Sequence, residues 1–263
     1  MSEHDDAVTY ARDGGVGVIT LNRPDNRNSM TEAILNGVAS RVAEARADAG
    51  LRCLVLTGRG RSFSAGADFK SQIQREVEGR QPHERSYAMY EPFLSLLDVE
   101  VPVVGALNGH AIGGGFGLAL VCDLRYARRD AKYGANFTRL GLHPGMAVSY
   151  LLPRLVGLPR AADWLYTGRL FDGHEGAAAG LFNEALPGEE VRPRAMEVAE
   201  RIASNAPIAM RMTKRSLMQG LGWDAKTAAY REAYAQAVSV ATEDAREGMS
   251  ALLEKRDPEF RGR

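Results

Sequence analysis

The sequence predicts an α/β fold, and two features of the chain support this prediction. Over the first 190 residues, short apolar segments typical of strands alternate with segments of helical spacing. From about residue 191 to residue 263 the helical spacing dominates and strand signals vanish. We therefore expect an α/β core with parallel strand pairing over residues 1–190 and a helical region over residues 191–263.

The first half of the chain begins with a hairpin, because alternating residues flank a glycine turn over residues 7–21. Ser29 and Glu32 have the spacing of a capping box, which predicts a helix to about Asp48. The apolar run Cys53–Thr57 predicts a strand. Further expected segments of this half are a charged helix to about residue 80, a helix over residues 83–97 and a strand over residues 102–107.

The second half continues the alternation before it becomes helical. The triple glycine Gly113–Gly115 is expected to open a helix that runs through Val121. The segments that follow are a strand over Leu124–Arg128, a short strand and loop over residues 133–140, and a helix from Gly145 towards Val156. Strands that alternate with helices at this spacing pair in parallel.

The composition is that of an ordinary globular protein without net charge. The 263 residues include 33 basic and 33 acidic side chains, and 45% of the residues are hydrophobic. Nucleic acids and anionic membranes bind surfaces with a basic excess, so neither is expected as a partner. The acidic N-terminus lacks the apolar segment of a secretory signal, and we expect a soluble cytoplasmic protein.

Glycine is abundant, with 28 residues, and two glycine-bearing segments each follow an expected strand and precede an expected helix. These segments are Ala65–Ala67 and Gly113–Gly115. Small residues let a ligand approach the backbone, and the first amides of a helix have no intrahelical partner. Two such donors that converge on one point would form an oxyanion hole, which stabilises negative charge on a carbonyl oxygen. The alternative is that the glycines only permit close packing of a helix on a strand.

Other motifs that carry chemistry are missing. No Gly-Lys-Ser/Thr follows a glycine loop, the dinucleotide fingerprint spacing is not found, and no Gly-x-Ser-x-Gly elbow occurs. The five histidines are scattered, so no metal site is expected. Cys53 and Cys122 lie in apolar runs, and we expect both thiols to be buried and unreactive.

Four motifs occur in an order and spacing that together are highly specific and cover nearly the whole chain. They are Leu21–Asp25 with Arg27 and Asn28, Phe63–Lys70, Asn108–Gly115, and Glu247–Ser250 with Glu254–Arg256. On these motifs the sequence resembles the crotonase superfamily, the enoyl-CoA hydratase/isomerase family. The resemblance implies a spiral core of repeated ββα units, a helical C-terminal region that forms a homotrimer, and often a hexamer built as a dimer of trimers.

The resemblance also implies an acyl-CoA thioester whose carbonyl oxygen lies between two backbone N–H groups. Carried over by position, these donors are Ala65 and Gly114, in the two glycine segments indicated above. Coenzyme A would be part of the substrate, and no further cofactor is implied. The residues that fall where the family contacts CoA are Arg27, Ala65, Gly66, Ala67, Asp68 and Lys70. For Arg27 and Lys70 the alternative is a solvated surface charge, and for Asp68 a hydrogen bond to the local backbone.

The chain departs from the family at two positions. Family members that hydrate a 2-enoyl-CoA use two glutamates to hold and activate water, and here these positions are Gly117 and Phe137. Neither side chain can transfer a proton, so the standard hydratase mechanism lacks its acid and its base. We interpret Gly117 and Phe137 as pocket residues that make the acyl site roomier and drier. The carboxylate nucleophile of the dehalogenase-like branch would fall on Gly145.

His143 is the remaining candidate for proton transfer, because it directly precedes an expected helix start in the segment where the family places its chemistry. The alternative is that it braces the turn at Pro144, and for His110 a structural role is favoured. We expect an enzyme of acyl-CoA or enoyl-CoA thioesters that stabilises an enolate or oxyanion with backbone N–H groups. Two alternatives stay open: a non-catalytic acyl-CoA-binding protein, and a hydrolase of a thioester or C–C bond assisted by His143.

Overall fold

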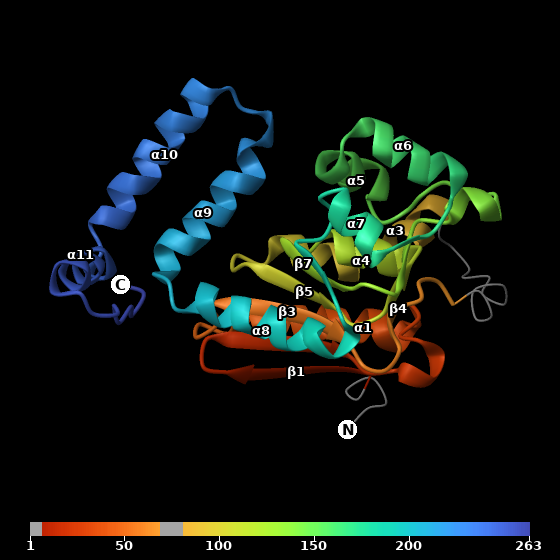
Figure 1. Cartoon of the computed structure of the whole chain (residues 1–263), viewed down its shortest axis with the longest axis horizontal. Coiled ribbons are helices and arrows are strands. Elements are labelled where there is room, and N and C mark those ends of the chain that lie inside the picture. Colours follow the sequence, from red (N-terminus) through yellow and green to blue (C-terminus); the bar gives the residue numbers. More distant parts are fainter. Residues whose placement is uncertain (1–6, 69–80) are drawn as a thin grey trace.

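Two sheets of unequal size form the core of the computed structural model, which describes residues 7–68 and 81–263 (Figure 1). The larger sheet has six strands in the order β1-β2-β3-β5-β7-β10, and the smaller has four in the order β4-β6-β8-β9. Their bounds are Val8–Asp13 (β1), Val16–Leu21 (β2), Cys53–Gly58 (β3), Ser62–Ser64 (β4), Val103–Leu107 (β5), His110–Ile112 (β6), Leu124–Arg128 (β7), Lys132–Gly134 (β8), Phe171–Asp172 (β9) and Glu184–Leu186 (β10). The α/β prediction and the predicted hairpin are confirmed.

Consecutive strands are divided between the two sheets. β3, β5 and β7 are neighbours in the large sheet, whereas β4, β6 and β8, each of which follows one of them, are neighbours in the small sheet. β4 pairs in parallel with β6, and β6 pairs in parallel with β8. The sequence predicted the strands of the large sheet except β10, and it missed β4, β6 and β9 of the small sheet. Each of the missed strands has only two or three residues and so shows too little alternation to be recognised.

The helices cover both faces of the large sheet and surround the small one (Figure 1). Their bounds are Glu32–Ala47 (α1), Pro82–Leu94 (α3), Gly114–Leu120 (α4), Val148–Val156 (α5), Leu158–Thr167 (α6), Gly173–Ala178 (α7), Gly188–Ala203 (α8), Pro207–Gln219 (α9), Ala225–Val240 (α10) and Glu243–Glu254 (α11), with the short 3₁₀ helix Phe137–Leu140 (η3) between β8 and α5. The predicted charged helix to about residue 80 lies mostly outside the described residues.

Two predicted helix starts are wrong. The cap of α1 is Thr31, whose side chain accepts a hydrogen bond from the Ile34 amide at 3.4 Å, whereas the Ser29 hydroxyl donates to the Asn26 carbonyl. The helix expected from Gly145 begins at Val148 because the two residues before it, Met146 and Ala147, have left-handed φ values of 59° and 55°. A local loop conformation thus delays α1 by two residues and α5 by three.

The C-terminal helices divide into one that belongs to the core and three that form an arm. α8 buries Val191, Ala195 and Ala199 against the large sheet. The predicted division between residues 190 and 191 therefore falls inside α8, and the arm of α9, α10 and α11 extends from the core after it (Figure 1). Lys214 of α9 ties the arm to the core through an ion pair with Asp123 at 2.8 Å and a hydrogen bond to a core carbonyl.

Candidate functional site

The loops that follow β4, β6 and β8 meet at one edge of the small sheet. These three strands are parallel neighbours, so their carboxyl ends lie side by side. The loops contain Ala65–Asp68, Gly113–Gly115 and Ala135–Phe137, respectively. The fold therefore brings together the two glycine segments that the sequence indicated and one of the two positions that lack a glutamate.

Gly66 and Gly114 lie in direct contact within this cluster of loops. A β-carbon added to Gly66 would lie 3.0 Å from the Gly114 nitrogen and would overlap the Ile112 carbonyl oxygen. Gly66 also has a φ of +83°, in the left-handed region that favours glycine. Close approach and backbone conformation thus both require glycine at position 66, and they hold the two turns against each other.

The Gly114 amide is an available hydrogen-bond donor at this junction. Gly114 is the first residue of α4, and within the described chain its N–H has no hydrogen-bond partner. The preceding Gly113 has a φ of 57° and donates its own N–H to the Gly134 carbonyl at 2.9 Å. The hydrogen bond to Gly134 therefore fixes the turn before α4, and with it the orientation of the free Gly114 amide.

The prediction that Ala65 supplies the second donor is wrong. The Ala65 N–H donates to the Arg27 carbonyl at 3.0 Å, which fastens the loop after β2 to the end of β4. Two residues further on, the Ala67 N–H has no hydrogen bond among the described residues. The Gly66 carbonyl between them is held by the Met30 N–H at 2.8 Å. Two alanines flank Gly66, and only the fold shows which of their amides is already bonded.

Gly117 does not enlarge a pocket, contrary to the expectation from the sequence. It is buried in the second turn of α4, and a β-carbon there would lie 3.1 Å from Met146 Cγ and 3.4 Å from a Val148 methyl group. Met146, which is 1% exposed, fills the space that a longer side chain at position 117 would need. The glycine therefore accommodates Met146, and the pocket it was expected to widen is occupied by protein.

Phe137 lies over the turn that leads into α4. It is the first residue of η3, is half-buried against the core, and its Cζ would be 3.9 Å from a β-carbon built on Gly113. An aromatic ring in this position shields the glycine turn from water and supplies no proton. Its ring lies beside Gly113, the residue that precedes the Gly114 amide, and a drier acyl site stays a prediction.

His143 lies in the exposed loop between η3 and α5. Its Nδ1 is 2.8 Å from the Pro144 carbonyl oxygen. If Nδ1 carries the proton of the neutral ring, it donates to this carbonyl and Nε2 is left as an acceptor. The contact braces the Pro144 turn, as the structural alternative expected, and it also leaves one ring nitrogen for chemistry.

The charged residues that were expected to contact CoA are only partly placed by the structure. Arg27 is exposed, with a left-handed φ of 59°, and its backbone carbonyl holds the Ala65 amide. Asp68 is half-buried at the end of the loop after β4. Lys70 lies outside the described residues.

Asn28 is a structural centre of the site. It belongs to the first of the four sequence motifs, but the motif itself predicts no role for it. Its side chain is fully buried, accepts from the Arg23 amide at 2.8 Å, and donates to the carbonyls of Arg59 and Ser62 at 3.1 and 2.9 Å. The Asn28 carbonyl accepts from the Ser64 hydroxyl at 2.8 Å. One asparagine thus joins the loop after β2 to both ends of the β3–β4 connection. Asn28 has a left-handed φ of 53°, which asparagine tolerates better than most residues. This backbone conformation explains the choice of asparagine, and it cannot be read from the sequence alone.

His110 has the structural role that the sequence favoured. Its Nδ1 accepts a hydrogen bond from the Lys132 amide at 2.9 Å, which links β6 to β8. Burial, with a smaller effect of the nearby Arg128 cation, lowers the pKa of His110 below its ordinary value. A protonated Nδ1 could not accept the Lys132 hydrogen bond, so the neutral ring belongs to the folded state.

The lowered pKa of His110 predicts a loss of stability in acid. Between the folded pKa and the ordinary value of about 6.5, the unfolded state binds more protons, so the free energy of unfolding rises with pH. The contribution is complete above about pH 6.5 and is lost as the pH falls through the folded pKa. In His110→Asn the Oδ1 can replace Nδ1 as acceptor, and we expect urea unfolding between pH 5 and 7 to depend less on pH than in the wild type. Equal pH dependence in the two proteins would contradict this assignment.

The described residues contain neither reactive thiols nor a metal site. Cys53 and Cys122 are both buried, as predicted, and burial raises the pKa of each thiol to about 12, which disfavours the reactive thiolate. Over residues 7–68 and 81–263, His, Cys, Asp and Glu side chains do not form a cluster of three or more that could hold a metal ion. In the same part of the chain, no helix combines the length and the apolar character needed to cross a bilayer.

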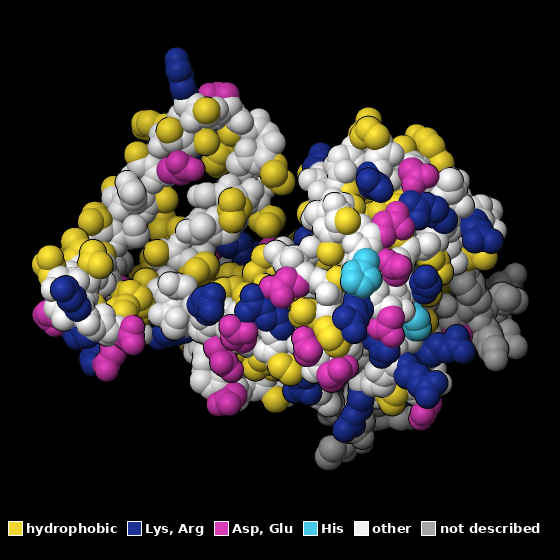
Figure 2. All heavy atoms as spheres, in the orientation of Figure 1, with side chains coloured by type: hydrophobic (Ala, Val, Ile, Leu, Met, Phe, Trp, Pro, Cys, Tyr) yellow, Lys and Arg dark blue, Asp and Glu magenta, His cyan; other side chains and the backbone are white. Residues whose placement is uncertain are grey.

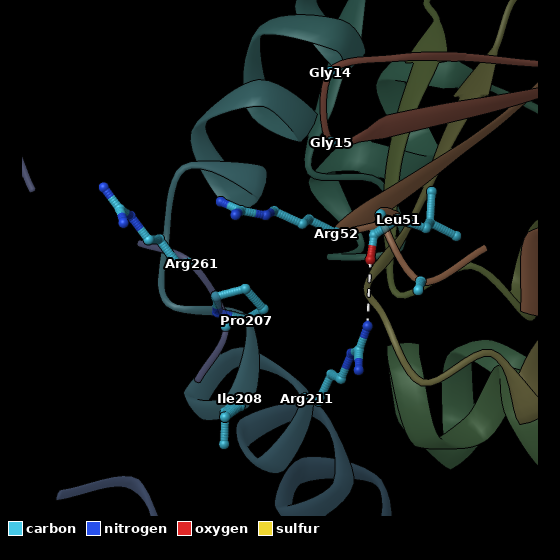
Figure 3. Close-up of a pocket in the computed structure, with 11 residues that line it drawn as sticks. Gly14, Gly15, Leu51, Arg52, Pro207, Ile208, Arg211 and Arg261 are labelled. Atoms are coloured by element: carbon cyan, nitrogen blue, oxygen red, sulfur yellow. Dashed lines mark hydrogen bonds between the residues drawn. The ribbon is translucent and has the colours of Figure 1, made fainter. Parts of the chain in front are cut away.

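A separate cavity of about 370 Å³ lies between the core and the arm (Figure 3). Arg52 and Arg211 line it, and the Arg211 guanidinium donates to the Leu51 carbonyl at 3.4 Å. Arg52 donates to the carbonyls of Ala203 and Phe260, which anchors the C-terminal tail. None of the predicted site residues lines this cavity, so it is distinct from the junction at Gly114.

Comparison with known proteins agrees with the fold. The family model described as enoyl-CoA hydratase/isomerase matches residues 11–263. The chain is 34% identical over 251 residues to a short-chain-enoyl-CoA hydratase of Clostridium acetobutylicum, covering 95% of each chain. It is 35% identical over 254 residues to a crotonyl-CoA hydratase of Syntrophomonas wolfei, covering 96% of this chain and 97% of the relative.

Among solved structures, the enoyl-CoA hydratase of Bacillus anthracis superposes with a TM-score of 0.93 at 34% identity, covering 98% of this chain and all of that one. The α/β architecture is thus the crotonase fold. The chain belongs to the enoyl-CoA hydratase/isomerase family.

Proposed function

We propose that this protein is an enzyme of acyl-CoA or enoyl-CoA thioesters that binds the thioester oxygen with the N–H groups of Gly114 and Ala67. The observation that carries the proposal is the contact of Gly66 with the Gly114 nitrogen, at the junction of two turns in which the amides of Ala65, Gly66 and Gly113 are already bonded. Two backbone donors held by a rigid fold stabilise an enolate or a tetrahedral oxyanion without reorganisation during the reaction. The names of the relatives support CoA thioesters as the substrate class.

The reaction itself is proposed to differ from hydration by a glutamate pair. Gly117 and Phe137 carry no acid or base, so proton transfer must come from another group. His143 is one such group, since its Nε2 has no protein partner in the described structure and its loop adjoins Phe137 of η3. With a water molecule as nucleophile, the same group would support hydrolysis of a thioester or C–C bond.

Hydrogen–deuterium exchange at the acyl α-carbon tests this function. The protein is incubated in D₂O with saturated and 2-enoyl-CoA thioesters, and each substrate is analysed by mass spectrometry and NMR. We expect deuterium at the α-carbon or a new product, and a decrease of either in His143→Ala. Tight binding without exchange, addition or hydrolysis would instead identify a non-catalytic acyl-CoA-binding protein, which the two missing glutamates also allow.

We further propose that the arm assembles the protein into a homotrimer or a hexamer. Hydrophobic side chains gather over α9, α10 and α11 (Figure 2). The most exposed of them are Leu217, Leu221, Tyr230, Tyr234, Leu252 and Leu253, at 65–84% exposure. Monomeric proteins rarely leave so many large apolar side chains in water, and a second and third copy of the chain would cover them.

Charge on the last helix should therefore prevent assembly. Leu252 and Leu253 are 79% and 84% exposed at the end of α11, so their replacement by aspartate would not disturb the core of the protomer. We expect light scattering after size-exclusion chromatography to give a trimer or hexamer for the wild type and a monomer for the double variant. Exchange of the equally exposed Leu158 on α6 for aspartate, with 71% exposure, serves as the control. A monomeric wild type would overturn this proposal without affecting the proposed chemistry.

A further inference from the structure

The hydroxyl group of Tyr90 occupies the space beside the backbone of Gly145. Tyr90 lies on α3 and is half-buried, with its ring packed against the hydrophobic core. A β-carbon added to Gly145 would overlap the Tyr90 hydroxyl and would lie 2.7 Å from the ring carbon that carries it. Any side chain at position 145, including the carboxylate considered from the sequence, would therefore displace this phenol.

Gly145 connects the Tyr90 hydroxyl to the helix that presents the free amide. The next residue, Met146, packs against Gly117 in the second turn of α4. Gly117 is one helical turn, about 5 Å, from the start of α4 at Gly114. α3 thus places the Tyr90 phenol against the loop that packs on α4, the helix whose first amide is proposed to bind the thioester oxygen.

The Tyr90 hydroxyl also has no hydrogen-bond partner within residues 7–68 and 81–263. The hydroxyl of the buried Tyr133 donates to the Arg128 carbonyl at 2.9 Å, and that of Tyr10 donates to Asp48 at 3.1 Å. Phenol groups with apolar surroundings normally find a partner. Within the described residues the Tyr90 hydroxyl lacks such a partner, and a bound ligand can supply one.

We propose that Tyr90 is a catalytic proton donor in this enzyme and takes over a role that the residues at 117 and 137 cannot fill. The proposal rests on the proposed function. In the step, the O–H bond of Tyr90 breaks as a C–H bond forms at the α-carbon of the enolate, whose oxygen is bound by the Gly114 amide. The resulting phenolate regains a proton from water. In the reverse direction the same oxygen accepts the α-proton, so the step exchanges hydrogen with solvent.

The variant Tyr90→Phe removes only the hydroxyl oxygen, and the ring that packs against the core remains. General acid–base groups contribute about 100- to 10,000-fold to the rates they assist. We expect the rate of α-deuterium exchange on bound acyl-CoA to fall at least about 100-fold. The dissociation constant for the same acyl-CoA, measured by calorimetry, should change less than about threefold, because the proton moves only during the reaction.

Tyr87→Phe is the matched control. Tyr87 lies one turn earlier on α3 and is 57% exposed, so the same chemical change there should leave exchange unaltered. Gly145→Ala provides a second variant that keeps the hydroxyl but pushes it aside, and it should also slow exchange.

The outcomes separate this proposal from the proposed function. If the wild type exchanges α-deuterium and Tyr90→Phe exchanges it equally fast, Tyr90 is not the proton donor, whereas the proposed function stands. If Tyr90→Phe weakens binding and leaves the exchange rate at saturation unchanged, the hydroxyl only helps to bind substrate and the proposal is overturned. A wild type that neither binds nor exchanges acyl-CoA overturns the proposed function itself.

Discussion

Gly114→Pro should lower the rate of α-exchange, and kcat/KM for any acyl-CoA substrate, by about 100- to 1000-fold. Proline has no N–H group, so the variant removes the donor that we propose to bind the thioester oxygen. Gly114 is the first residue of α4, where proline is well tolerated because its φ fits the helix. Loss of one oxyanion-hole donor costs about 3–4 kcal/mol of transition-state stabilisation, which corresponds to this decrease.

Gly114→Ala is the control for the added β-carbon. A β-carbon at this position overlaps the sulfur of Met30, which is at the flexible end of its side chain and can move. Alanine and proline both impose this shift, but alanine keeps the N–H, so most of the activity should remain. Circular dichroism and thermal unfolding would establish that both variants fold. Equal activity of the proline and alanine variants would show that the Gly114 amide does not bind the reacting oxygen.

The sequence indicated which turns form the candidate site more reliably than which backbone amides in them are free to bind a ligand. Glycine after a strand and before a helix has few uses, so Gly66 and Gly114 identified the two turns that the fold brings into contact. Which amide remains free depends on hydrogen bonds between distant segments. The bond from Ala65 to Arg27 joins residues 38 positions apart, and periodicity carries no information about such a contact.

The prediction for Gly117 was wrong for a related reason. A glycine in place of a glutamate appears in the sequence as lost volume, and we expected the acyl site to widen at Gly117. The volume is taken by the Met146 side chain, which packs against Gly117. Tyr90 and Gly145 are 55 residues apart and were linked by no motif, so their contact is visible only in the structure. Contacts between side chains that are distant in the sequence are the part of a site that sequence motifs and hydrophobic periodicity predict least well.

Asn28→Ala should lower the free energy of unfolding by about 3 kcal/mol, because it leaves the buried Ser62 carbonyl and two partly buried backbone groups without partners. The Arg23 amide and the carbonyls of Arg59 and Ser62 would each lose a hydrogen bond, and each unpaired buried group costs about 1–3 kcal/mol. Alanine also tolerates the φ of 53° less well than asparagine does. Urea unfolding at one protein concentration measures the effect, since assembly would make stability depend on concentration.

Two further variants separate the hydrogen bonds from the backbone conformation. Asn28→Gly removes the side chain but accepts the left-handed φ, so it should recover only the small conformational part of the loss. Asn36→Ala on the exposed face of α1 should stay within about 0.5 kcal/mol of the wild type. The Arg27 carbonyl next to Asn28 holds the Ala65 amide, so the loop fixed by Asn28 also orients the turn that contains Gly66. Asn28→Ala should therefore weaken acyl-CoA binding at temperatures where it is still folded. A stable variant with unchanged binding would mean that the turn at Gly66 is held without this asparagine.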